Sequence, residues 1–230
     1  MHAGTPPPRP RLLISRPPDA GPETEASSSP PPPARPISTK TFHGRSMTIP
    51  NPTTTATASL TLDEKALRYA ATQDLDEGAV TPAYGPHRDA IVKLLNDALA
   101  TELVCVLRYK RHYFTADGLE SPAIAAEFLV HANEEAAHAD LIAQRIVQLG
   151  GEPDFRPRTL EERSHAQYDE SSDLKAMVRA NLVAERIAVE AYRQMITLIG
   201  DKDPTTRRML EGILADEEEH ADELKDWLHR

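Results

Sequence analysis

Two short stretches of this chain indicate its fold: Ala132-Asn-Glu-Glu-Ala-Ala-His-Ala-Asp140 and Asp216-Glu-Glu-Glu-His-Ala-Asp222. Each contains the pattern Glu-x-x-His, formed by Glu135 with His138 and by Glu217 with His220. A glutamate and a histidine three residues apart lie on the same face of an α-helix, so both side chains can reach one point. The repetition indicates two equivalent helices that face a common centre.

A lone glutamate precedes each pattern on another predicted helix. Glu102 precedes Glu135 by 33 residues, and Glu185 precedes Glu217 by 32, so the two sets are offset by 82 to 83 residues throughout. Six ligand-type side chains repeated at one offset predict a two-metal site inside a four-helix bundle.

Prolines, glycines and N-capping residues mark the ends of four long helices, predicted at residues 86–114, 121–150, 172–200 and 203–228, after a short helix at 62–73. Pro86 starts the first helix, and Ser121 is the expected N-cap of the second. The pair Gly150-Gly151 ends the second helix, and Asp203 starts the fourth. Short links make two antiparallel hairpins, and residues 151–171 are long enough to cross the bundle. The predicted fold is all-α.

Helical periodicity places each of the four glutamates in the middle of an otherwise apolar stripe. The flanking stripe positions include Leu95 and Tyr109, Phe128 and Ile142, Leu182, Val189 and Ile196, and Leu210 and Leu224. An unpaired buried carboxylate costs several kcal/mol, whereas two divalent cations would neutralise four carboxylates. Two shared acids, with one further Glu and one His for each ion, would hold the ions about 3.5–4 Å apart. Such ligands suit iron or manganese.

Three neighbours of these residues invite a second interpretation. Tyr109 and Tyr192 each lie seven residues after a lone glutamate, so they either donate hydrogen bonds to metal-bound carboxylates or are core aromatic residues. His131 has Ile213 as its counterpart, and it is either a core histidine or an accessory metal ligand. The off-stripe acids Glu134, Glu218 and Glu219 are expected to be solvated, and His112 carries no interpretable pattern.

Composition restricts the partners of the chain. Residues 1–60 hold 14 of the 20 prolines, and residues 1–58 are predicted to form a disordered tail before a domain at 59–230. The remaining 170 residues carry 20 Lys/Arg and 33 Asp/Glu, which argues against DNA binding by their surface and favours attraction of cations. No apolar run predicts a membrane span or secretory signal. The single cysteine, Cys105, excludes an internal disulfide, and a reducing cytoplasm is the expected setting.

Residues 86–228 resemble bacterioferritin and its smaller ferritin-like relatives. Four strings carry the resemblance: Leu99-Ala-Thr-Glu102-Leu-Val, Ala132-Asn-Glu-Glu135-Ala-Ala-His138-Ala-Asp, Asn181-Leu-Val-Ala-Glu185 and Asp216-Glu217-Glu-Glu-His220-Ala-Asp. The resemblance implies a ferritin-like bundle with Glu102 and Glu185 as terminal ligands and Glu135 and Glu217 as bridging ligands. It implies that His138 and His220 complete two iron sites, and Tyr109 matches a tyrosine beside the bacterioferritin centre.

Two departures from bacterioferritin change what the resemblance implies. Ala136 stands where bacterioferritin has its haem-binding methionine, so no haem is expected. The chain ends at Arg230 without a fifth helix, so a 12-subunit shell like that of Dps proteins and an oligomer that forms no shell are alternatives to a 24-subunit shell.

The implied reaction is oxidation of Fe(II) to Fe(III) by dioxygen or hydrogen peroxide, for iron storage and detoxification. Because the same ligands serve other enzymes, a di-iron peroxidase or a dimanganese catalase remains an alternative. A third hypothesis is a Dps-like shell that protects DNA through the Pro/Arg-rich tail.

Overall fold

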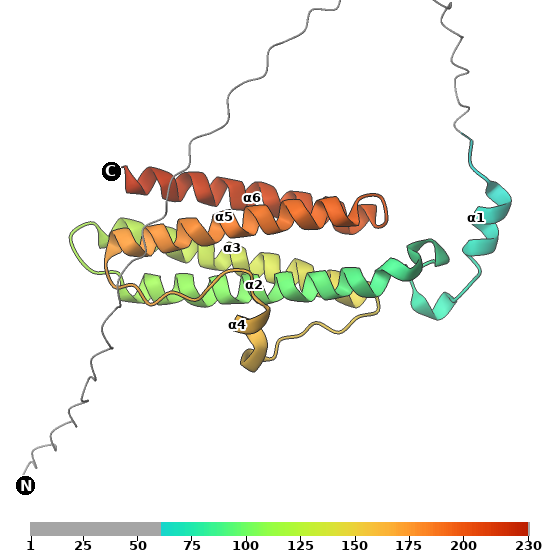
Figure 1. The fold of residues 1–230 in the computed structure, drawn as a ribbon, viewed down its shortest axis with the longest axis horizontal. Helices are drawn as coiled ribbons and strands as arrows, with labels where there is room; N and C mark the ends of the chain where they lie inside the picture. The colour runs from blue at the N-terminus through green and yellow to red at the C-terminus, as the bar shows by residue number, and fades with distance from the viewer. Residues whose placement is uncertain (1–60, 230) are drawn as a thin grey trace, which may run out of the picture. The chain divides into compact units, whose positions relative to one another are not determined.

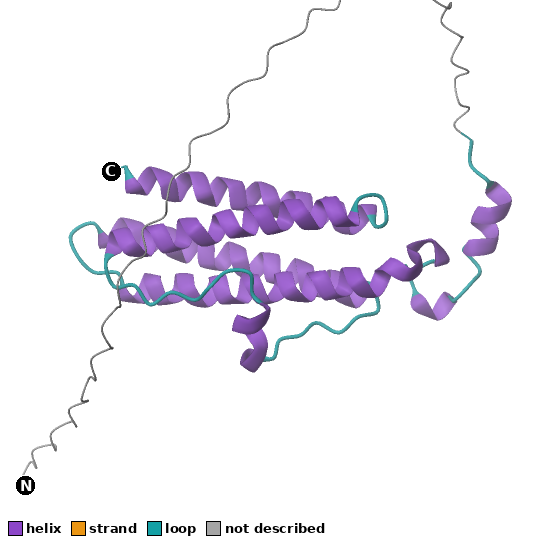
Figure 2. Ribbon diagram, in the orientation of Figure 1, coloured by secondary structure: helices purple, strands orange, loops and turns teal. Residues whose placement is uncertain are grey.

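The computed structural model describes residues 61–229, and their regular structure is entirely helical. Four long helices lie side by side in Figure 1: α2 (Arg88–Thr115), α3 (Ser121–Gln148), α5 (Leu174–Ile199) and α6 (Pro204–Leu228). Figure 2 draws no strand among the described residues, so the predicted all-α class is confirmed. The tail predicted at residues 1–58 lies outside the described residues.

The helices form two antiparallel hairpins, α2 with α3 and α5 with α6, joined by one long crossover (Figure 1). The crossover contains the 3-10 turn η3 (Pro157–Thr159) and the short helix α4 (Leu160–Arg163). Side chains of α2 hold it: Arg111 donates to the Ser171 carbonyl at 2.8 Å, and the Asn96 side-chain oxygen accepts from the Asp154 N–H at 2.7 Å. No helix among the described residues is long and apolar enough to cross a membrane.

The ends of α3 and α6 follow elementary capping chemistry. At the end of α3, Gly150 has a φ of 75°, and the Gly151 N–H donates to the Ile146 carbonyl at 2.9 Å. This left-handed glycine cap satisfies carbonyl groups that a helix end leaves without partners. At the start of α6, the Asp203 carboxylate accepts from the Thr206 N–H at 2.9 Å. Both ends were predicted from the sequence.

Two helix starts differ from the prediction. Ser121 is the first residue of α3 rather than its N-cap, and Glu120 precedes it without a capping hydrogen bond from its side chain. The prediction that Ser121 caps the helix was therefore wrong. Helix α2 begins at Arg88, two residues after Pro86, because Pro86 belongs to the 3-10 segment η2 (Pro82–His87), which Gly85 interrupts with a φ of 53°. Before it lie α1 (Glu64–Ala70) and η1 (Leu75–Glu77).

Most of the apolar core lies in two large clusters, and all four long helices contribute to both. The first cluster includes Ile91, Leu95, Ile142, Ile146, Met195, Ile199 and Leu210, and the second includes Tyr109, Ile124, Phe128, Met177, Val178 and Leu224. In every helix the glutamate of interest lies between these two sets in sequence. The bundle therefore places a polar layer between two apolar halves.

The buried face of α5 is rotated slightly from its predicted stripe. Leu182, Val189 and Ile196 are only half-buried, whereas Asn181 and Ala188 are buried. Glu185 and Tyr192 remain at the centre of the buried face because they lie close to its axis in either case.

Candidate metal centre

Six side chains predicted from the sequence meet in the polar layer. They are Glu102 from α2, Glu135 and His138 from α3, Glu185 from α5, and Glu217 and His220 from α6. All six residues are at most 4% exposed. Buried acids in this number are unusual, because a carboxylate withdrawn from water needs a compensating charge or hydrogen bond.

The six residues form two overlapping groups whose ligand atoms lie within 4.8 Å of one another. One group is Glu102, Glu135, His138 and Glu217, and the other is Glu135, Glu185, Glu217 and His220. Glu135 and Glu217 belong to both. Two groups that share two carboxylates have the topology of two cation positions with two bridging ligands.

Each imidazole turns the same nitrogen toward the carboxylates. Nδ1 of His138 lies 3.2 Å from Glu217 Oε1 and 3.5 Å from Glu102 Oε2. Nδ1 of His220 lies 3.9 Å from an oxygen of Glu185 and 3.9 Å from one of Glu217. A cation between these atoms would therefore meet one imidazole nitrogen and several carboxylate oxygens at either position.

Two carboxylates outside the predicted set hold the other nitrogen of each ring. His138 Nε2 lies 3.2 Å from Asp216 Oδ2, and His220 Nε2 lies 3.0 Å from Glu134 Oε2. An Nε2–H donated to a carboxylate leaves the Nδ1 lone pair free to bind a metal. Glu134, expected to be solvated, is half-exposed but has this partner. The 82-residue offset between Glu134 and Asp216 is the sequence pattern that could have identified both.

The two tyrosines donate across the bundle to the lone glutamates. Tyr109 of α2 donates its hydroxyl to Glu185 Oε1 on α5, and Tyr192 of α5 donates to Glu102 Oε1 on α2. Each hydrogen bond occupies one oxygen of a glutamate and leaves Oε2 facing the centre. This arrangement matches the interpretation of the tyrosines as partners of ligand carboxylates.

The atoms without hydrogen-bond partners are concentrated at the same place. Among the described residues, eight buried side-chain nitrogen or oxygen atoms lack a partner, and seven belong to the six central residues. They are Glu102 Oε2, Glu135 Oε1, Glu185 Oε2, both Glu217 carboxylate oxygens, and Nδ1 of His138 and His220. Buried polar atoms are normally satisfied, so seven unsatisfied atoms that point to one centre fit a pair of bound cations.

The pKa values of the central residues reflect burial and the mutual repulsion of four neighbouring carboxylates. Burial, and then the charges of the neighbouring glutamates, raise the pKa of Glu135 well above its usual value. Burial raises the pKa of Glu217 in the same way. Burial alone would raise the pKa of Glu185, but the His220 imidazole, a neighbouring carboxyl and the Arg108 guanidinium lower it to about 2. Burial alone would lower the pKa of His138, but contacts with three carboxylates raise it. In the metal-free centre, the raised pKa values of Glu135, Glu217 and His138 favour bound protons over four uncompensated carboxylates.

Residues 92–230, more than half of the chain, match the family described as a ferritin-like domain. The chain belongs to the ferritin-like family. Bacterioferritin of Mycobacterium avium is 30% identical over 139 residues, which span 60% of this chain and 83% of that protein. A nutrient stress-induced DNA-binding protein of Synechococcus is 30% identical over 139 residues, spanning 58% of this chain and 78% of that protein.

A solved structure supports the same family. A dodecameric thioferritin, the bacterioferritin-related protein of Bacteroides fragilis, superposes with a TM-score of 0.60 at 33% identity. The match covers 62% of this chain and 86% of that one. The predicted resemblance to the bacterioferritin and ferritin-like di-iron family is therefore confirmed.

The centre of this ferritin-like protein is not symmetric, because a buried guanidinium lies on one side. Arg108 is fully buried, and its Nη2 lies 3.9 Å from Glu185 Oε1 and 3.4 Å from Cys105 Sγ. Its Nε donates to Asn181 Oδ1 at 2.7 Å, and the Asn181 amide contacts His112 Nδ1 at 3.0 Å. The chain position matching Arg108 in the other half is Ala191. The sequence pattern had not assigned a role to Arg108 or His112.

His131 also lies on the Glu185 side. It is fully buried, stacks on the His220 ring at a centroid distance of 4.2 Å, and places Nδ1 3.1 Å from the Tyr109 hydroxyl. Its Nε2 lies 2.9 Å from Glu223 Oε2. His131 therefore contacts both the centre and a residue at the surface.

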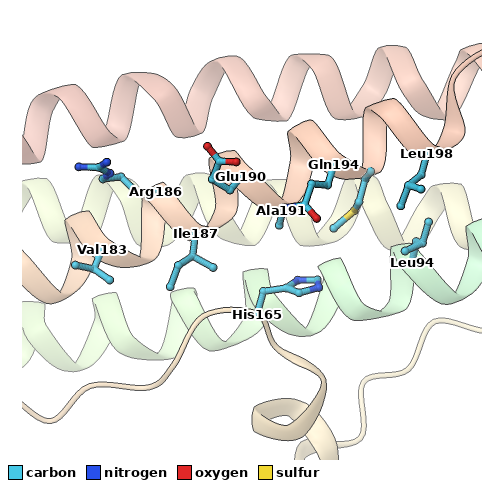
Figure 3. Close-up of a pocket in the computed structure, with 10 residues that line it drawn as sticks. Leu94, His165, Val183, Arg186, Ile187, Glu190, Ala191, Gln194 and Leu198 are labelled. Carbon is cyan, nitrogen blue, oxygen red and sulfur yellow. The ribbon is translucent and has the colours of Figure 1, made fainter. Parts of the chain in front are cut away.

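A groove of about 530 Å³ lies elsewhere, between α5, α2 and the crossover (Figure 3). Leu94, His165, Val183, Ile187 and Leu198 are among its lining residues, and none of the six central residues belongs to it. The chemistry of the polar layer is therefore separate from this groove.

Proposed function

We propose that this protein is a ferroxidase that oxidises Fe(II) to Fe(III) at a di-iron centre within one subunit, for iron storage and detoxification. The observation that carries the proposal is the pair of four-residue groups that share Glu135 and Glu217. Glu102 with His138, and Glu185 with His220, would complete the two positions. Oxygen and imidazole ligands accept iron or manganese, and the charge of two divalent cations balances four carboxylates.

The reaction uses two Fe(II) ions as substrate. Each ion gives up one electron, so dioxygen with two protons yields hydrogen peroxide, or hydrogen peroxide with two protons yields two water molecules. The chain's own residues fix the positions of the ions. Tyr109 and Tyr192 hold one oxygen of each terminal glutamate, and Asp216 and Glu134 orient the two imidazoles. Burial of the layer between two apolar clusters excludes bulk water from the site.

The test compares the effect of a glutamate-to-glutamine substitution at two adjacent residues. Glu217→Gln changes a residue that belongs to both groups, whereas Glu218→Gln removes the same charge from an exposed neighbour. We expect the first variant to lose rapid Fe(II) oxidation, followed by absorbance of Fe(III), and the second to keep it. Equal oxidation rates in both variants would contradict the assignment of the centre.

The same ligands would also serve two alternative enzyme activities. A dimanganese catalase would release oxygen from hydrogen peroxide when loaded with manganese and without iron, and a di-iron peroxidase would consume peroxide with an added reductant. Neither activity requires Fe(II) as substrate, so peroxide assays on the manganese-loaded and iron-loaded protein separate them from ferroxidase activity.

We also propose a homo-oligomeric shell of 12 or 24 subunits. The similarity to a dodecameric thioferritin supports 12. Light scattering on the full chain measures the subunit number. A DNA-protecting role is supported only by the similarity to a DNA-binding relative, and a DNA gel shift with the full chain tests it.

A further inference from the structure

A second cluster of metal-ligating side chains lies between α3 and α6, outside the six central residues. Glu127, His131 and Glu223 each offer one ligand atom, and these atoms lie within 4.8 Å of one another. His131 is fully buried, whereas the Glu223 side chain is 44% exposed. The cluster therefore reaches from solvent into the core beside His220.

The internal repeat shows that this cluster is an addition to one half only. With the 82-residue offset that relates Glu135 to Glu217, the counterparts of Glu127 and His131 are Met209 and Ile213. The counterpart of Glu223 is Leu141. Three ligand-type residues thus replace three apolar residues at matched positions, although the bundle packs without them in the other half.

The contacts of His131 leave room for a proton or a metal ion at its outer nitrogen, Nε2. Tyr109 donates its one hydroxyl proton to Glu185, so the contact between its oxygen and His131 Nδ1 requires an Nδ1–H donor. A neutral ring with hydrogen on Nδ1 leaves a lone pair on Nε2. That lone pair faces Glu223 Oε2 at 2.9 Å, and two acceptors at this distance need a proton or a metal ion between them. Two ligand atoms bound to one transition-metal ion lie roughly 3.0–3.4 Å apart, close to this separation.

We propose that Glu127, His131 and Glu223 form an accessory divalent-cation site. It lies at the protein surface, on the side of the centre that contains Glu185 and His220. The next group inward is His131, Glu134 and His220, whose ligand atoms also lie within 4.8 Å of one another. The outer and inner groups therefore share His131, and the inner group includes His220 of the central layer. A role of this cluster as an entrance for Fe(II) to the central layer rests on the proposed function. Binding of a divalent cation at the cluster does not.

The experiment counts Zn²⁺ ions, which cannot be oxidised, bound to the full chain by equilibrium dialysis. We expect about three ions per chain in the unmodified protein and about two in the variant Glu127→Met/Glu223→Leu, which copies the apolar half. Asp222→Leu is the matched control, because it removes an exposed charge one residue from Glu223 and should keep about three ions. Anomalous diffraction at the zinc edge should place the third ion against His131 Nε2.

Two outcomes would overturn the proposal: about two ions in the unmodified protein, or a third ion that persists in the double variant. The first would mean that a proton occupies the space between His131 and Glu223. Glu135→Gln separates this result from failure of the proposed function. It should reduce binding at the central layer and leave the zinc peak at His131.

Discussion

Replacing Glu135 by glutamine should stabilise the metal-free protein and remove most of the stabilisation that cations provide. Glu135 is 1% exposed, and its Oε1 has no hydrogen-bond partner. Burial and the surrounding glutamates raise its pKa above the ordinary value of 4.5. An acid whose pKa rises on folding lowers stability once the pH exceeds the unfolded value, and the loss grows until the pH passes the folded pKa.

The size of this stabilisation follows from the interval between the ordinary glutamate pKa of 4.5 and neutral pH. Each pH unit in which the folded protein alone keeps the proton costs about 1.4 kcal/mol, so the ceiling at pH 7 is about 3.4 kcal/mol. Glutamine removes this cost but buries an amide that is incompletely hydrogen-bonded, which leaves a net gain of about 1–3 kcal/mol. For a domain of this size the gain corresponds to a rise in Tm of roughly 3–10 °C. At pH 4.5 the gain should disappear, because the cost of ionisation is then nearly absent and only the cost of the buried amide remains.

The assay is thermal unfolding followed by circular dichroism at pH 7, in chelator and with excess Zn²⁺. Binding at one hundred times Kd stabilises a protein by about 2.7 kcal/mol per site, and Glu135→Gln should lose more than half of the total because Glu135 serves both groups. Glu218→Gln should match the unmodified protein in both buffers. A variant that unfolds at a lower temperature in chelator, with an undiminished zinc shift, would contradict the assigned role of Glu135.

Three further predictions concern stability. Tyr192→Phe removes the hydroxyl donated to Glu102 and should cost about 1.5–3 kcal/mol in urea unfolding of the metal-free protein, and an unchanged midpoint would contradict the pairing. Asp203→Asn should cost about 2–4 kcal/mol at pH 7, because the buried carboxylate caps α6 and pairs with Arg145 at 2.9 Å. Burial alone would raise the pKa of Asp203, but these partners lower it below 3.8, so its contribution is present above that pH and is lost as the pH falls through the folded value. Urea unfolding at pH 7 and pH 3 should therefore show a smaller difference at pH 3. Gly151→Ala should cost about 1–3 kcal/mol, measured as a lower Tm, because the added Cβ would lie 2.6 Å from a valine methyl carbon of α2.

The six central residues could be predicted because their arrangement follows from helical spacing. Glu135 and His138 share a face by the geometry of one helix, and the 82-residue repeat relates them to Glu217 and His220 without knowledge of how the helices cross. The capping residues Gly150 and Asp203 are equally local. Such patterns fix the class of fold and the candidate ligands before any packing is known.

The polar partners around the centre could not be predicted in the same way. Glu134 lies one residue from the stripe, and its contact with His220 depends on how α3 and α6 lie against each other. Arg108 was overlooked because a buried guanidinium is rare, and its neighbour Asn181 lies on a face that the predicted stripe of α5 missed by a small rotation. These contacts depend on helix rotation and crossing, which periodicity alone does not specify.

Cations bound by the shared acids would also hold the two hairpins together. Each four-residue group takes three residues from one hairpin and a single acid from the other, Glu217 for the first group and Glu135 for the second. A cation at either position would thus be a reversible cross-link between the N-terminal and C-terminal halves of the bundle. If the crossover were cut by a protease, the halves would remain joined by the core and by these ions. Chelation would then loosen the nicked protein far more than the intact chain.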